Sequence, residues 1–154
     1  MSDVEIRSDV AIRNVSSDLH IAACFAVMCE LRPQLADADE LVRRVRVQAA
    51  QGYVLAGAFL GDACAGCVGY RLADNLVHGR HLYVDDLVVA EAHRRARIGE
   101  RLLAHACDVA RAAGCAKLLL DTPTANVLGH RFYYRAGLAF TAMRFSLALG
   151  ALEM

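Results

Sequence analysis

The sequence contains little of what marks disordered, exported or membrane-spanning chains. It has 2 prolines in 154 residues and 22% charged residues, so long disordered stretches are not expected. The first residues, MSDVEIRSDV, are charged and lack the apolar core of a secretory signal. No run of about 18 apolar residues occurs, so we expect no membrane span. These absences predict a cytoplasmic protein with no membrane partner.

The chain also lacks an excess of charge of either sign, because its formal net charge is 0. A protein that binds nucleic acid through a strongly positive overall field is therefore disfavoured. We expect no nucleic-acid partner.

Metal and redox sites are the usual reasons to look at a Cys-x-x-Cys pair, and Cys64 and Cys67 form one. A structural zinc site needs four ligands, and no second close cysteine pair follows. A redox pair is expected at the start of a helix, whereas this pair falls in an apparent hairpin. Without an export signal, the 6 cysteines are expected to be reduced thiols. We predict no metal site, with Cys64 and Cys67 as small apolar filler.

Hydrophobic periodicity and turn residues predict an alternation of strands and helices. The expected strands are 10–15, 53–60, 63–72, 81–90, 115–121 and 138–149, and the expected helices are 19–31, 37–50, 98–113 and 127–137. Strand 115–121 is continuously apolar, which is typical of a strand buried on both faces. This order predicts a single α/β domain over residues 1–154, built around one mixed and mostly antiparallel sheet. Residues 81–121 form its central β-α-β unit, flanked by the other helices.

The strongest chemical signal is a basic loop where a helix begins, Arg94-Arg95-Ala96-Arg97-Ile98-Gly99. The first amides of a helix have no internal partners and sit at the positive end of the helix dipole. Such a turn binds phosphate readily. The loop therefore indicates a phosphate cradle, with an ordinary solvated basic loop as the alternative.

The segment LYVDDLVVAEAHRRARIGERLL resembles the acetyl-coenzyme A motif of the GNAT superfamily of N-acetyltransferases. The resemblance implies that backbone groups of Leu87, Val88 and Val89 bind the pantetheine arm. It also implies that the turn from Arg94 to Glu100 holds the pyrophosphate, through Arg94, Arg95, Ala96, Arg97, Ile98, Gly99 and Glu100. Arg97 stands where the family usually has a glycine, and a non-glycine residue in left-handed backbone costs about 1–2 kcal/mol.

A second match follows the same family pattern, with Asn126, Phe132, Tyr133, Gly137 and Leu138 at the expected spacing. In the family this segment forms the other wall of the cofactor site, which places Asn126 and Phe132 among the cofactor-binding residues. The resemblance therefore implies a cofactor core over about residues 81–138. Acceptor specificity is then expected in the helices at about 17–50 and in loop 73–80.

The chemistry implied by the resemblance is direct attack of a primary amine on acetyl-coenzyme A, with no metal. Tyr133 matches the position of the general acid that helps the thiolate leave. Asp85 matches an acidic residue found in some members, and we take it as the general base. Asp86 is its neighbour, and because successive strand residues point to opposite faces, at most one of the two is expected to face the acceptor. His78, His81 and His130 are weaker alternatives as the general base.

Several alternatives stay open from the sequence. The acceptor is a small-molecule amine or an amine on a peptide or protein. The chain could instead be a non-catalytic acyl-coenzyme A sensor or scaffold, an alternative that rests on Arg97 at a glycine position of the motif. It could also be a binder of another nucleotide phosphate. A homodimer is common among similar proteins.

Overall fold

The computed structural model describes residues 2–150, apart from the side chains of residues 6–8. The chain divides after Leu120 into two compact units. The fold is α/β with a mixed, mostly antiparallel sheet, as predicted.

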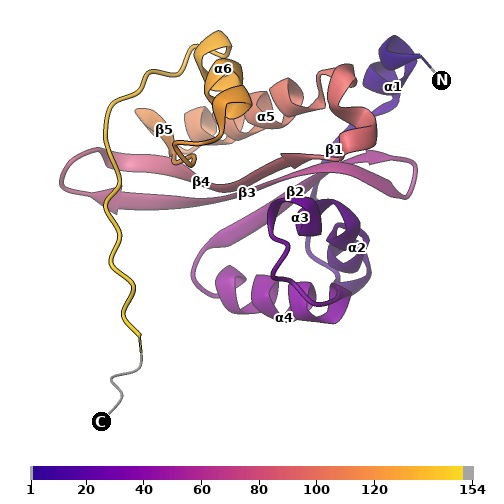
Figure 1. The fold of residues 1–154 in the computed structure, drawn as a ribbon, viewed down its shortest axis with the longest axis horizontal. Coiled ribbons are helices and arrows are strands. Elements are labelled where there is room, and N and C mark those ends of the chain that lie inside the picture. The colour runs from indigo at the N-terminus through magenta and orange to yellow at the C-terminus, as the bar shows by residue number, and fades with distance from the viewer. Residues whose placement is uncertain (1, 151–154) are drawn as a thin grey trace. The chain divides into compact units, whose positions relative to one another are not determined.

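The first unit is built on a five-stranded sheet whose strands follow one another in chain order (Figure 1). Its strands are β1 (Ala11–Val15), β2 (Tyr53–Leu60), β3 (Ala63–Asn75), β4 (Gly79–Val89) and β5 (Lys117–Leu120). Neighbouring strands are antiparallel except β4 and β5, which are parallel. This confirms the predicted hairpin and the predicted β-α-β unit.

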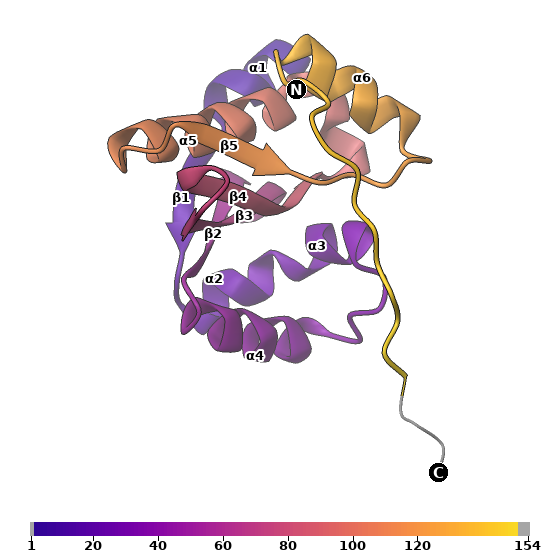
Figure 2. The same cartoon turned by 90° about the vertical axis from the view of Figure 1, so that its left-hand side faces the viewer.

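Helices cover both faces of this sheet (Figures 1 and 2). On one face lie α2 (Asp18–Ala23), α3 (Phe25–Leu31) and α4 (Ala38–Ala49), and on the other lies α5 (Ile98–Ala112). Each face has its own apolar core: Leu55 and Phe59 are buried toward α2–α4, while Val68 and Leu82 are buried toward α5. No helix within residues 2–150 is long and apolar enough to cross a membrane.

Two β-bulges interrupt the regular alternation of side chains in the sheet. In the first, Cys64 and Gly66 of β3 pair with the consecutive residues Phe59 and Ala58, so Ala65 is the extra residue. In the second, Val84 and Asp86 of β4 pair with Tyr70 and Gly69, so Asp85 is the extra residue. A bulge brings residues of odd spacing to the same face.

Several predicted elements need correction. The helix expected over 19–31 is two helices, because Cys24 closes a tight turn in which its N–H donates to Ile21. The short helix α1 (Asp3–Asp9) was not predicted. A further 3₁₀ helix, η1 (Glu91–Ala96), precedes α5. Strand β5 is shorter than predicted and only half-buried, because it forms an edge of the sheet.

The second unit contains α6 (Val127–Arg135), which confirms the predicted helix. The strand predicted over 138–149 is wrong, since these residues form no strand. Their alternating apolar side chains, among them Phe145, Leu147 and Leu149, are exposed. A strand needs a neighbouring ladder, and the described part of this unit offers only a helix.

Candidate functional site

The first feature of the site is an open edge on β4. The ladder between β4 and β5 runs from His81–Lys117 to Val84–Leu120 and stops there. Residues 86–89 therefore pair with β3 alone among the strands of the first unit. The predicted cofactor residues Leu87, Val88 and Val89 lie on this edge, where backbone amides and carbonyls are positioned to extend hydrogen bonding to an extended ligand.

The second feature is the turn that opens α5. Arg97 has φ 58° and ψ 27°, and in the part of the chain that the structure describes it is the only non-glycine residue with positive φ. Its side chain pairs with Glu100 at 2.8 Å and does not cap the helix. The first-turn amides of Ile98, Gly99 and Glu100 thus begin the helix without a side-chain cap. This arrangement suits an anionic ligand.

The remaining residues of the predicted phosphate loop have separate roles. Ala96 and Ile98 are buried and anchor the turn in the core beside α5. Arg94 reaches back to β4, where its Nε donates to the Val89 carbonyl at 3.4 Å, and it also lies 3.7 Å from the Glu30 carboxylate. Arg95 is exposed. The loop therefore presents cationic side chains at the surface directly after the open edge of β4.

A pocket of about 270 Å³ is lined by side chains from α3, the segment 32–35 that follows it, α4, Tyr53 of β2 and the bulged part of β4. Both Asp85 and Asp86 line it, although alternation along a regular strand would turn only one of them toward this space. The bulge at Asp85 is the physical reason. The apolar part of the lining comes from Met28, Leu35, Leu41 and Val45, and none of the lining residues comes from loop 73–80.

Each of the two carboxylates has an arginine partner. The Asp85 carboxylate accepts from Arg71 Nε at 2.9 Å, and Arg71 also donates to Gln48. The Asp86 carboxylate accepts from Arg32 Nε at 2.9 Å and from the Tyr53 hydroxyl at 2.7 Å. Asp86 is the more buried side chain, 13% exposed against 25% for Asp85. The pocket floor is thus a network of alternating charges that fixes the positions of both carboxylates.

Tyr53 belongs to this network, and sequence reasoning missed it. Burial and the Asp86 carboxylate raise the pKa of Tyr53 far above its usual value, so the hydroxyl stays a donor. Its ring crosses β3 at Gly69, where a Cβ would lie 1.9 Å from the hydroxyl. The pairing of Gly69 with Asp86 explains this contact, but it requires the register, which the sequence alone does not supply.

In the second unit, α6 carries the other predicted site residues. The Asn126 side chain caps the helix by accepting from the Gly129 N–H at 3.1 Å, and its amide donates to Thr122. Tyr133 is half-buried, burial raises its pKa, and its ring meets Phe132 edge-on at 5.3 Å between centroids. Tyr133 is therefore protonated at neutral pH and can donate a proton.

Comparison with known proteins identifies the family to which a chain with this arrangement belongs. The model of the acetyltransferase (GNAT) family matches residues 21–138, which include the β4 edge, the α5 turn and α6. The chain belongs to the GNAT acetyltransferase family. This GNAT protein is accordingly an acetyl-coenzyme A-dependent N-acetyltransferase, as the motif resemblance implied.

The relatives of this acetyltransferase differ in the share of their own length that this chain matches. It is 27% identical over 124 residues to an uncharacterized N-acetyltransferase, YhdJ, of Bacillus subtilis, covering 80% of this chain and 87% of that one. It is 32% identical over 82 residues to the streptothricin acetyltransferase of Streptomyces lavendulae, covering 53% of this chain but only 43% of that one.

Solved structures agree on the fold of this acetyltransferase. The structure of AAC(6')-Iy in complex with the bisubstrate analog CoA-S-monomethyl-acetylneamine matches with a TM-score of 0.78. The match covers 92% of this chain and 99% of that one at 16% identity. Identity this low supports the shared fold and leaves the substrate open.

Proposed function

We propose that this enzyme transfers the acetyl group of acetyl-coenzyme A to a primary amine that enters the Asp85–Asp86 pocket as a cation. The observation that carries the proposal is the β4 bulge. It brings two adjacent carboxylates to one pocket. The β4–β5 ladder ends just before it, at Val84–Leu120, and this leaves residues 87–89 as an open backbone edge. The acceptor and the thioester would thus be held by consecutive segments of a single strand.

The cosubstrate fits the residues on the first unit. The pantetheine arm would extend along residues 87–89 and hydrogen-bond to the backbone, as an added strand does. Its pyrophosphate would lie against the uncapped first turn of α5, with Arg94 and Arg95 supplying further positive charge. Arg97 contributes its backbone, because its side chain is already paired with Glu100.

The acceptor must lose a proton before it attacks, since an ammonium has no free electron pair. We assign this task to Asp85, which is the more exposed carboxylate of the pocket. Asp86 is held by Arg32 and Tyr53, and it would fix the position of the incoming amine by its charge. The Asp85 carboxylate would then bind Arg71 and the amine at the same time. Arg71 would stabilise the carboxylate between proton transfers.

Transfer proceeds by attack of the amine nitrogen on the thioester carbon. The carbon–sulfur bond breaks, the amide forms, and the departing sulfur takes a proton. We assign Tyr133 as the donor of that proton, by its match to the family position and because burial keeps its hydroxyl protonated. A backbone N–H on the β4 edge would polarise the carbonyl oxygen.

The pocket favours a compact amine. It is about 270 Å³ in volume, and its lining carries the carboxylates of Asp85 and Asp86 together with the cations of Arg32 and Arg44. The names of the relatives point the same way, since one is a streptothricin acetyltransferase and another was solved with an acetylneamine analog. The six free thiols agree with the reducing cytoplasm, where we place the enzyme.

Release of free coenzyme A tests the proposal. Diamines, aminosugars and amino-acid amides are each compared with the analogue in which hydroxyl replaces the reacting amine. We expect release with one class of cationic amine only, and a higher KM for it in Asp86→Asn. Tight binding of acetyl-coenzyme A with no release for any amine would instead support the sensor alternative.

A further inference from the structure

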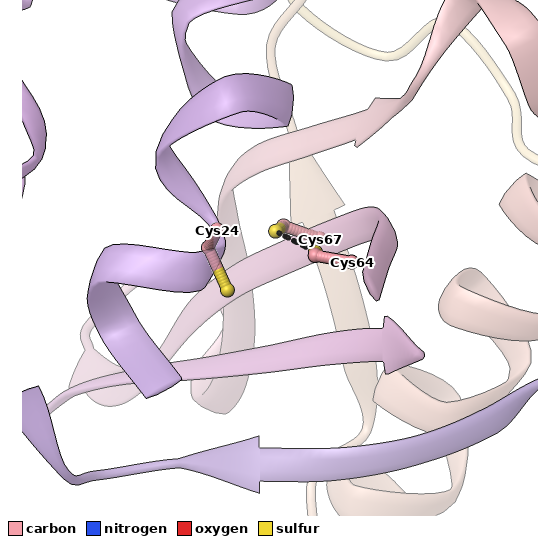
Figure 3. A group of neighbouring side chains, drawn as sticks. All are labelled: Cys24, Cys64 and Cys67. Carbon is pink, nitrogen blue, oxygen red and sulfur yellow. Dashed lines mark hydrogen bonds between the residues drawn. The ribbon is translucent and has the colours of Figure 1, made fainter. Parts of the chain in front are cut away.

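Three cysteine side chains come together on the face of the sheet covered by α2–α4 (Figure 3). The sulfur atoms of Cys24, Cys64 and Cys67 all lie within 4.8 Å of one another. We propose that these three thiols form a binding site for a soft, thiophilic d¹⁰ metal ion held by three thiolates, with Cu(I) as the ion that the geometry fits best.

The fold builds this cluster from two breaks in regular structure. Cys24 lies at the junction of α2 and α3, in the tight turn that separates them. In a regular strand Cys64 and Cys67 would point to opposite faces, because they are three residues apart. The bulge at Ala65 removes this opposition, and the two sulfur atoms lie 3.5 Å apart. A cluster assembled by a helix break and a bulge is not visible in the spacing of the sequence.

The distances suit a metal ion of ordinary size. Metal–sulfur bonds of about 2.3 Å place thiolate sulfurs about 4 Å apart around a single ion, whether the arrangement is trigonal or tetrahedral. The observed spread, from 3.5 Å up to at most 4.8 Å, brackets that value. Small rotations about the side-chain torsions would therefore suffice for binding.

Metal binding requires the three thiols to give up their protons. Binding therefore releases protons to solvent and replaces weak S–H contacts with metal–thiolate bonds.

Coordination number selects among the soft ions. The described residues contribute three sulfurs and no fourth histidine, cysteine or carboxylate ligand to this group. Zinc prefers four ligands, and a water at the half-exposed Cys64 would have to complete its shell. Cu(I) is selected by soft thiolate ligands and is satisfied by three of them.

Anaerobic titration of the reduced protein with Cu(I), against a colorimetric Cu(I) chelator, tests the site. A parallel titration uses Zn(II). We expect one Cu(I) per chain, and an affinity lower by roughly 100-fold or more in Cys64→Ser. Loss of a metal ligand should cost at least as much affinity as loss of a residue that only hydrogen-bonds to a ligand. Cys107→Ser and Cys115→Ser are matched controls, half-buried like Cys64, and should bind Cu(I) like the unaltered protein.

A second measurement avoids substitution in the core. In the unaltered protein, metal loading should protect Cys64 from alkylation by iodoacetamide while Cys29, Cys107 and Cys115 react as before. Protection by Zn(II) at lower concentration than Cu(I) would overturn the choice of ion. Equal loss of Cu(I) affinity in the control variants, or no protection by either ion, would overturn the site itself.

Discussion

At the scale of single residues, Arg97 is the one non-glycine position with positive φ among residues 2–150. It adopts left-handed geometry at the start of α5, where glycine would enter without strain. The ion pair with Glu100 is exposed and offsets little of this cost. The strain is therefore retained at a turn that the family uses for phosphate binding, as strained residues often are at functional sites.

Arg97→Gly is accordingly expected to leave the free energy of unfolding unchanged or raise it by up to about 1 kcal/mol, since relief of strain outweighs the added freedom of the unfolded chain. Denaturant unfolding measures the change. Arg97→Ala keeps the strain and should show no gain, and Arg95→Gly should lose stability because Arg95 needs no glycine. Clear destabilisation by Arg97→Gly would mean that the side chain matters more than the backbone.

Tyr53 makes stability depend on alkaline pH. Its folded-state pKa lies above the unfolded value of about 10, so the folded state keeps a proton that the unfolded state gives up. The resulting stability is complete below about pH 10 and is lost as the pH rises beyond it.

Tyr53→Phe should therefore be less stable than the unaltered protein at pH 8, by about 1 kcal/mol, and should lose less stability on going to about pH 11. Urea unfolding at both pH values measures this. Tyr70 and Tyr133, whose pKa values are also raised by burial, keep part of the alkaline slope in the variant. An unchanged slope would show that Tyr53 does not bond to Asp86.

Tyr133→Phe should lower kcat by on the order of 100-fold, because the leaving thiolate loses its proton donor. The affinity for acetyl-coenzyme A should hardly change, since the ring remains. Tyr134→Phe is the matched control, because Tyr134 is exposed on the same helix. Steady-state kinetics with the accepted amine measure the change. An unaltered kcat in Tyr133→Phe would show that Tyr133 is not the general acid.

At the scale of the elements, the bulges in β3 and β4 decide what the sheet presents. Alternation along a regular strand predicted that Asp85 and Asp86 would point to opposite faces, and in a regular strand Cys64 and Cys67 would do the same. The bulges reverse both expectations. Nothing in the local residue types marks them, because a bulge depends on the register between two strands.

The contact between β2 and β3 at Gly69 allows a test at this scale. Gly69→Ala places a Cβ where the Tyr53 hydroxyl lies and should destabilise the protein by about 1–3 kcal/mol. Tyr53→Leu removes the obstructing ring, so the double variant should cost less than the sum of the single changes. Simple additivity in denaturant unfolding would contradict this packing.

At the scale of the whole molecule, the sequence predicted the fold class and most elements, because their signals are local. Ser17 and Asp37 cap α2 and α4 with the side-chain oxygens that such helix starts favour, and the Gly61 turn closes the hairpin. The predicted last strand failed because alternating apolar residues such as Phe145 and Leu147 indicate a strand only if a partner strand is present. The turn at the start of α5 was predictable from its helix-start pattern, whereas Tyr53 and Cys24 reach their clusters through tertiary contacts.

Calorimetric titration with acetyl-coenzyme A, with ATP as the comparison, tests the central claim most directly. The claim is that the open edge of β4 and the first turn of α5 together bind this thioester. We expect one acetyl-coenzyme A per chain and at least tenfold weaker binding of ATP, which carries the phosphates but no pantetheine to lie along residues 87–89. Equal binding of the two ligands would reduce the site to a phosphate cradle, and no binding of acetyl-coenzyme A would contradict the account.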